Sequence, residues 1–203
     1  MRTDKVTAGN VYDKYNTNNP IARYLVSRFL RSFEELIKHL PVKKVLEIGC
    51  GEGYLTNRMF TLFEGAEIHG VDISLEIIAQ AAETYPHLHF SCQSAYSLCY
   101  KDREFDLVVA CEVLEHLENP IQALLEMQRI ADKYALASVP REPIWRMMNV
   151  LRGAYLRQWG NSPGHVQHWS ANSFLTLVGK YFEIVETVKP WPWTMVLCRV
   201  RQK

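Results

Sequence analysis

Hydrophobic residues follow two different periods along this chain, and the way these periods alternate predicts its fold. From residue 44 onward, short apolar runs are followed by stretches in which apolar residues recur every three or four positions. The runs are expected to be strands and the periodic stretches helices. Such alternation forms right-handed βαβ units, so we expect an α/β fold with a doubly wound, Rossmann-like, mostly parallel sheet. Expected strands cover residues 45–48, 68–71, 88–92, 105–110 and 134–139, and expected helices cover 54–63, 74–85 and 119–131. Ser74 and Asn119 are expected to cap the last two of these helices.

The amino-terminal region, residues 1–42, precedes this alternation. Residues 1–18 are polar, and a helix is predicted between the cap Asn19-Pro20 and the breaker Pro41. This region is expected to be an arm followed by a helix.

The carboxy-terminal region breaks the rhythm. A helix over 172–180 is followed by strands over 182–188 and 194–200, and the linker 189–193 is too short for a helical crossover. These last two strands are therefore expected to pair as an antiparallel hairpin. The stretch 140–170 is an insertion between the fifth strand and the last helix.

Composition indicates one globular domain, 1–203, without a strong electrostatic preference. The chain has 203 residues, of which 48% are hydrophobic, and its 23 basic residues nearly cancel its 22 acidic ones. Neither nucleic acid nor an anionic membrane is expected to attract it globally. No signal peptide and no apolar run of about 20 residues is evident. The five scattered cysteines contain no Cys-x-x-Cys pair, so a cytoplasmic location is expected. Three of them, Cys92, Cys111 and Cys198, are expected to pack as small hydrophobes.

Three glycines follow the first strand at alternate positions: Gly49, Gly51 and Gly53, directly behind Glu47. In open parallel sheets, ligands bind beyond the carboxyl ends of the strands. Missing side chains let the backbone approach such a ligand, and the N–H groups of the following helix point toward it. The sequence therefore predicts a ligand site at this loop.

Two ligand classes fit a glycine loop of this kind, and the residues favour one of them. The dinucleotide pattern G-x-G-x-x-G would need glycine where Tyr54 stands, and Glu47 would repel a pyrophosphate. A cationic ligand suits the carboxylate better, and S-adenosylmethionine carries a sulfonium and an ammonium but no phosphate. A second acid, Asp72, ends the next strand, where it can accept both ribose hydroxyls.

With these residues together, the chain resembles the class I S-adenosylmethionine-dependent methyltransferases, of the type 11 and ubiquinone-biosynthesis-like group. The resemblance rests on VLEIGCGEG at 45–53, GVDIS at 70–74 and FDLVVACEVLEHL at 105–117. It implies a seven-stranded sheet with an antiparallel last strand and S-adenosylmethionine as cofactor. The implied cofactor-binding residues are Glu47, Gly49, Cys50, Gly51, Gly53, Asp72, Ile73, Ser94, Ala95 and Cys111. The family's acid after the third strand is absent, which leaves the Ser94 hydroxyl or the Ala95 N–H to contact adenine.

The insertion is expected to form the acceptor side of the site. Residues 144–156 have helical spacing, and arginines outnumber acids between 141 and 157. Three interpretations stay open: a packed helix with a solvated basic face, a substrate lid, or a helix lying on a membrane surface. Arg141 and Trp145, together with Tyr15 of the arm, are expected to contact the substrate.

Three histidines are candidates for the catalytic base or for orienting the nucleophile: His116, His165 and His168. Glu115 is expected to be a surface or capping acid. His165 and His168 are spaced as a metal pair could be, but no third ligand is evident in the sequence, and no metal is expected.

The resemblance implies methyl transfer to the oxygen or carbon of a small-molecule acceptor, such as a metabolite, lipid or glycan precursor. No nucleic-acid partner is expected. Two alternatives remain open: a non-catalytic S-adenosylmethionine-binding regulatory module, and an NAD-dependent oxidoreductase, which the glycine spacing disfavours.

Overall fold

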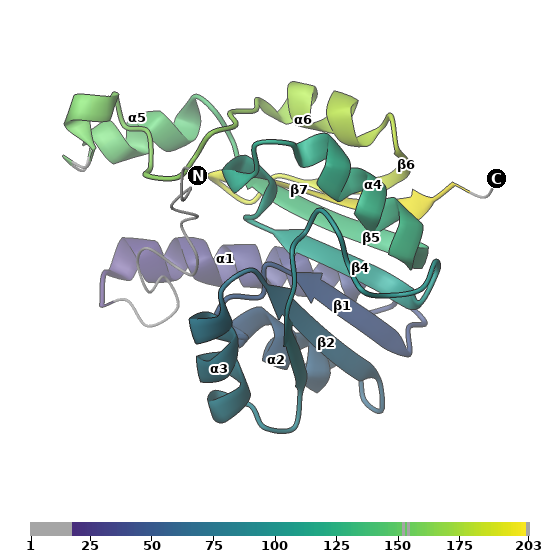
Figure 1. Ribbon diagram of the computed structural model, residues 1–203. Coiled ribbons are helices and arrows are strands. Elements are labelled where there is room, and N and C mark those ends of the chain that lie inside the picture. The colour runs from purple at the N-terminus through teal and green to yellow at the C-terminus, as the bar shows by residue number, and fades with distance from the viewer. Residues whose placement is uncertain (1–17, 152, 154, 202–203) are drawn as a thin grey trace, which may run out of the picture.

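The computed structural model describes residues 18–151, 153 and 155–201, which form one seven-stranded sheet with helices on both faces (Figure 1). The strand order is β3-β2-β1-β4-β5-β7-β6, and β7 runs antiparallel to both of its neighbours, β5 and β6. The expected α/β fold with its antiparallel carboxy-terminal hairpin is confirmed. The strands are β1 (Lys44–Ile48), β2 (Glu67–Asp72), β3 (His89–Cys92), β4 (Phe105–Cys111), β5 (Ala131–Pro140), β6 (Phe182–Val188) and β7 (Trp193–Val200).

Side-chain caps explain where most of the helices begin. The side chain of Asn19 accepts hydrogen bonds from two backbone N–H groups of the first turn, and Ser74, Asn119 and Ser170 each accept one. The first three caps were predicted from the sequence. The helices are α1 (Pro20–Ile37), α2 (Tyr54–Leu62), α3 (Leu75–Thr84), α4 (Pro120–Ile130), α5 (Ile144–Leu151) and α6 (Ala171–Val178), with short 3₁₀ turns η1 (Leu114–His116) and η2 (Leu156–Gln158).

The central strands of the sheet are buried on both faces, and alternate residues of each enter different cores. On β4, Leu107 and Val109 pack with residues of α1 and α2, whereas Val108 and Ala110 pack with residues of α4 and α6. This alternation is the period of two expected of a strand. Because both faces of these strands are covered, the central strands are continuous apolar runs in the sequence.

The hairpin brings a distant part of the chain to the edge where the parallel strands end. β7 pairs with β5 so that Trp193 lies opposite Pro140, the last residue of β5. The start of β7 therefore lies at the same sheet edge as the glycine loop.

Two local expectations were wrong. The helix expected over 144–156 ends at Leu151, and Gly153 beyond it has a left-handed φ of 72°, a conformation that cannot continue an α-helix. Cys92 is exposed rather than packed, because it ends β3, which is an edge strand. In contrast, Cys198 is buried and Cys111 is half-buried, as expected.

None of the helices in the described ranges combines the length and apolar character that crossing a bilayer requires.

Asp106 ties the start of β1 to the start of β4, at the edge opposite the glycine loop. Its carboxylate accepts the N–H groups of Lys43 (2.7 Å) and Lys44 (3.1 Å) and pairs with the Lys133 ammonium at 2.7 Å. Burial raises the pKa of Asp106, but Lys133 and the two N–H groups outweigh it, and the net pKa lies below its usual value. The ionised carboxylate therefore stabilises the fold.

We expect Asp106→Ala to lower the free energy of unfolding by roughly 1–3 kcal/mol at pH 7. Because the folded-state pKa is depressed, this stabilisation is complete above the unfolded pKa of about 3.9 and is lost as the pH falls through the folded pKa. Urea unfolding of both proteins at pH 7 and at about pH 3 should show the difference shrinking at low pH. A difference that does not change with pH would contradict a role for the charge.

Candidate functional site

The carboxyl ends of four parallel strands meet at one edge of the sheet. β1, β2, β4 and β5 end there, and β1 and β4 lie side by side although two strands separate them along the chain. The chain runs outward in one direction from β1 to β3 and in the other from β4. A sheet of this type binds its ligand where the strand order reverses.

The glycine loop turns sharply at this reversal point. Gly49 has a φ of 68°, and its N–H donates to the Val71 carbonyl at 2.7 Å. A Cβ at Gly49 would lie 2.4 Å from Cγ2 of Val113, the second residue after β4. Glycine is therefore required here both by the backbone conformation and by close packing between the loop and the end of β4.

Gly51 also needs a left-handed conformation, with a φ of 53°. A valine at this position would strain the backbone whether or not a ligand is bound. Loss of ligand binding by Gly51→Val would therefore not show whether glycine is needed for the backbone turn or for the space beside a ligand.

Two carboxylates flank the loop, and both are buried. Glu47 is 3% exposed and accepts a hydrogen bond from the Thr56 hydroxyl of α2. Asp72 is 8% exposed, and its two oxygens accept the N–H groups of Gly51 and Ser74, each at 3.1 Å. Asp72 ends β2 as expected, but it is buried there because the glycine loop folds over it. Each of its oxygens keeps a further lone pair for a ligand hydroxyl.

The loop lies in a negative environment. Burial raises the pKa of the Cys50 thiol, and the charges of Glu47 and Asp72 raise it further. The same field that disfavours a thiolate favours a cation. The residues present therefore fit the sulfonium and ammonium groups of S-adenosylmethionine better than a pyrophosphate.

The remaining predicted cofactor residues lie near the ends of β2, β3 and β4. Ile73 is exposed just after β2, and Cys111 ends β4. Ser94 follows β3, and its hydroxyl accepts the Tyr96 N–H at 3.2 Å. Ala95 packs against the core. A role for these four residues in cofactor binding stays a prediction.

Sequence reasoning missed Glu112, the first residue after β4. It has a φ of 61°, which is uncommon outside glycine, and its carboxylate accepts hydrogen bonds from the Trp193 indole and the Ser138 hydroxyl. The motif contains Glu112, but nothing in the sequence indicates a partner 81 residues away.

The insertion packs against this edge through Arg141 and Trp145. The Arg141 N–H donates to the Pro192 carbonyl at 2.9 Å, which holds the start of the insertion beside β7. The Trp145 indole donates to the Ser162 hydroxyl at 2.8 Å, and its ring lies 5.9 Å from that of Trp193. Both residues are half-buried at the predicted acceptor side. The third predicted substrate residue, Tyr15, lies outside the described residues.

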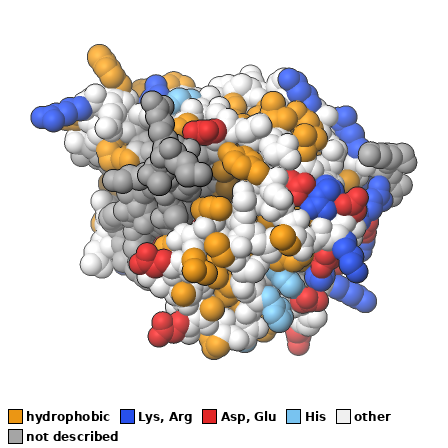
Figure 2. All heavy atoms as spheres, viewed as in Figure 1, with side chains coloured by type: hydrophobic (Ala, Val, Ile, Leu, Met, Phe, Trp, Pro, Cys, Tyr) orange, Lys and Arg blue, Asp and Glu red, His pale blue; other side chains and the backbone are white. Residues whose placement is uncertain are grey.

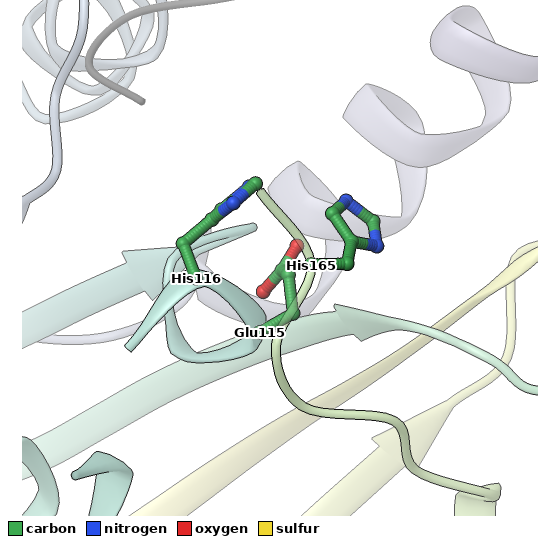
Figure 3. A group of neighbouring side chains, drawn as sticks. All are labelled: Glu115, His116 and His165. Atoms are coloured by element: carbon green, nitrogen blue, oxygen red, sulfur yellow. The ribbon is translucent and has the colours of Figure 1, made fainter. Parts of the chain in front are cut away.

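The structure brings two of the three candidate histidines together. The rings of His116 and His165 lie 4.8 Å apart, edge to face, and one ligating atom from each lies within 4.8 Å of a Glu115 carboxylate oxygen (Figure 3). Figure 3 shows the Glu115 carboxylate between the two imidazoles. His116 and Glu115 come from η1, directly after β4, and His165 comes from the insertion.

Glu115 is 2% exposed, so the expectation of a surface acid was wrong. The insertion covers it, because the Val166 and Gln167 N–H groups both donate to the Glu115 carbonyl, at 2.9 and 3.0 Å. This contact joins parts of the chain about 50 residues apart, which the sequence pattern could not indicate.

His168 belongs to a different set of contacts. Its Nε2 lies 2.9 Å from the Arg146 guanidinium and its Nδ1 lies 3.8 Å from the Glu142 carboxylate. Burial and the Arg146 charge lower the pKa of His168, while Glu142 raises it. His168 therefore contacts the insertion's own charged residues, and His116 and His165 are the histidines that the fold places together.

Comparisons with known proteins agree with this geometry. Residues 46–136 match the family model described as a methyltransferase domain. The chain is 28% identical over 121 residues to a malonyl-[acyl-carrier protein] O-methyltransferase of Halorhodospira halophila, covering 58% of this chain and 40% of that protein. It is 33% identical over 87 residues to a ubiquinone biosynthesis O-methyltransferase of Burkholderia thailandensis, covering 40% of this chain and 37% of that protein. The chain therefore spans about 40% of the length of these curated relatives.

Solved structures share the fold. The crystal structure of magnesium protoporphyrin IX methyltransferase from Synechocystis, with bound S-adenosylhomocysteine, superposes with a TM-score of 0.68 at 18% identity, covering 93% of this chain and 91% of that chain.

The sheet order, the glycine loop and the two acids define a Rossmann-like methyltransferase fold. The family match over residues 46–136 and the curated relatives show that this part of the chain is similar to the class I S-adenosylmethionine-dependent methyltransferases. S-adenosylmethionine is the cofactor of this class.

We expect Gly49→Ala to destabilise the fold more than Gly65→Ala. Both glycines have a left-handed φ, but a Cβ at Gly65 meets nothing within 4 Å, whereas one at Gly49 meets Val113. Left-handed strain of about 1–2 kcal/mol applies to both, and the Val113 overlap adds to Gly49→Ala alone. Urea unfolding measures the two free energies. The double variant Gly49→Ala/Val113→Ala should recover part of the loss, and equal losses for the two single variants would show that this packing does not matter.

We expect Asp72→Asn to weaken S-adenosylmethionine binding by roughly 1.5–3 kcal/mol, measured by calorimetry, because an amide offers one acceptor oxygen where the carboxylate offers two. The matched control is Glu76→Gln, which removes one charge from an exposed position in the first turn of α3. Its affinity should stay within a few-fold of wild type. Equal effects of the two substitutions would indicate a general charge effect in place of a ribose contact.

Proposed function

We propose that this protein transfers the methyl group of S-adenosylmethionine to a hydroxyl oxygen of a small-molecule acceptor, with residues 1–203 acting as one domain. The observation that carries the proposal is the convergence of Glu115, His116 and His165 beside the glycine loop. Val113 packs on Gly49, and η1 begins at the next residue, so the group adjoins the predicted cofactor site. Both curated relatives described above are named O-methyltransferases, which supports oxygen as the acceptor atom.

S-adenosylmethionine supplies an activated methyl group when it is bound, so the protein mainly has to position the acceptor and exclude water. Glu47 and Asp72 provide the negative side of the site, which favours the cationic cofactor over its neutral product. The acceptor hydroxyl must also lose its proton, and a neutral imidazole is suited to this at neutral pH.

The hydrogen bond of His116 to a carbonyl oxygen fixes the tautomer of its imidazole. Its Nδ1 lies 3.0 Å from the Gly164 carbonyl oxygen, which can only accept, so Nδ1 carries the proton. Nε2 of neutral His116 is then the basic atom. We propose that His116 and His165 together orient the acceptor hydroxyl and assist its deprotonation.

The surface of the insertion suggests an acceptor with an apolar part. Large apolar side chains are exposed on α5, on η2 and just after it, and Arg157 is exposed among them. At the end of the molecule where Figure 1 shows α5, Figure 2 shows hydrophobic and basic side chains on the surface. An amphiphilic acceptor, reached from a membrane surface through residues 141–157, fits this composition. The exposed apolar residues are Met147, Val150, Leu151, Leu156 and Trp159.

The test is to replace each histidine and to measure cofactor binding and turnover separately. His116→Ala and His165→Ala should leave S-adenosylmethionine affinity within a few-fold, while release of S-adenosylhomocysteine with the true acceptor should fall by about 10²-fold for at least one of them. His39→Ala is the matched control, because His39 is exposed and precedes β1, at the opposite edge of the sheet. His168→Ala should behave like this control.

Screening a metabolite library for S-adenosylhomocysteine release would identify the acceptor for this test. Wild-type turnover by both variants would show that the histidines are structural. Loss of cofactor affinity would assign them to the cofactor pocket, and cofactor binding without turnover on any acceptor would favour a non-catalytic binding module.

A further inference from the structure

We infer that Glu115, His116 and His165 form a binding site for a divalent transition-metal ion, with Zn²⁺ as the cation that best matches the ligands. One carboxylate oxygen and one nitrogen from each imidazole lie within 4.8 Å of one another (Figure 3). No metal was expected from the sequence, because the pair considered there was His165 and His168, and only the fold brings Glu115 and His116 to His165.

The chemistry of the three ligands selects the class of ion. Imidazole nitrogens suit zinc and its transition-metal neighbours, whereas Mg²⁺ and Ca²⁺ prefer oxygen ligands. Two histidines and one glutamate are a ligand set of catalytic zinc sites, in which a fourth position stays open for water or substrate.

The surrounding residues hold the ligands in place in the way a metal site requires. His116 donates its Nδ1–H to the Gly164 carbonyl, which leaves Nε2 to face an ion. The Trp145 ring lies almost parallel to His165, at 22° and 6.0 Å, and is itself fixed by the Ser162 hydroxyl. The Glu115 backbone is held by two N–H groups of the insertion.

The three ligand atoms would have to move somewhat closer together when an ion binds. Bonds of about 2.0–2.2 Å to a tetrahedral zinc would place the ligand atoms roughly 3.4 Å apart, less than the largest separation here. Rotations of the three side chains can provide this contraction, because the hydrogen bonds to the Glu115 carbonyl already join the two backbone segments.

The site has a consequence for catalysis that rests on the proposed function. An acceptor hydroxyl bound at the open position would have its pKa lowered by the metal and would release its proton to water, so the histidines would act as ligands and no protein base would be needed. The acceptor would then bring an oxygen able to ligate the ion.

The direct test measures metal binding in the absence of cofactor and acceptor. The full chain carrying Cys92→Ser and Cys99→Ser, which removes two exposed thiols that bind zinc on their own, is stripped with a chelator and titrated with Zn²⁺ by calorimetry. One equivalent should bind. Co²⁺ in its place should give the visible absorption bands of a four-coordinate site.

Each ligand variant, His116→Ala, His165→Ala and Glu115→Gln, should weaken Zn²⁺ binding by 10²-fold or more. His39→Ala and His168→Ala should remain within about three-fold. Circular dichroism checks folding, and because Glu115 is buried, the two histidine variants keep the test valid if Glu115→Gln fails to fold.

Absence of stoichiometric binding, or equal binding by wild type and both histidine variants, would overturn the metal site whatever the enzyme does. Zinc binding without any methyl transfer would support the site and contradict the proposed function. Full turnover by chelator-treated enzyme would support the proposed function and overturn the catalytic role of the ion.

Discussion

The close packing of Gly49 against Val113 is the constraint on which the rest of the site depends. A Cβ at Gly49 would lie 2.4 Å from the Val113 side chain, so the loop after β1 and the segment after β4 fit together only because one of them carries no side chain. This contact lies at the point where the strand order reverses. It sets the glycine loop, the predicted cofactor site, beside η1, which carries Glu115 and His116.

The two sides of the site differ in charge and in chemistry. On one side, the buried carboxylates Glu47 and Asp72 create a negative field. Burial raises the pKa of Cys50, and the charges of these two carboxylates raise it further. On the other side, two imidazoles and a buried carboxylate lie together where η1 meets the insertion. The first set suits a cation. The second suits either an acceptor hydroxyl that must lose its proton or a metal ion that would lower the pKa of that hydroxyl. The fold places the two sets next to each other, as a methyl transfer between two substrates requires.

The sequence predicts the parts of this arrangement that are local and leaves out those that depend on distant contacts. The βαβ alternation, the caps at Asn19, Ser74 and Asn119, and the terminal hairpin follow from period and spacing, and the structure confirms them. The burial of Asp72 and Glu115 could not be predicted, because each is covered by a segment whose path only the fold determines. The pairing of Glu112 with Trp193 depends on how the carboxy-terminal hairpin returns to the sheet edge. The pairing of His116 with His165 in place of His168 depends on the path of the insertion.

We propose that His116 and His165 face the methyl group that is transferred. A crystal structure with S-adenosylhomocysteine bound tests this most directly, because the position of the sulfur marks the origin of the methyl group. We expect the ribose hydroxyls at Asp72 and the sulfur between the glycine loop and η1, with His116 and His165 facing it across a space the size of a small acceptor. A sulfur directed away from η1, or separated from both imidazoles by protein side chains, would contradict it.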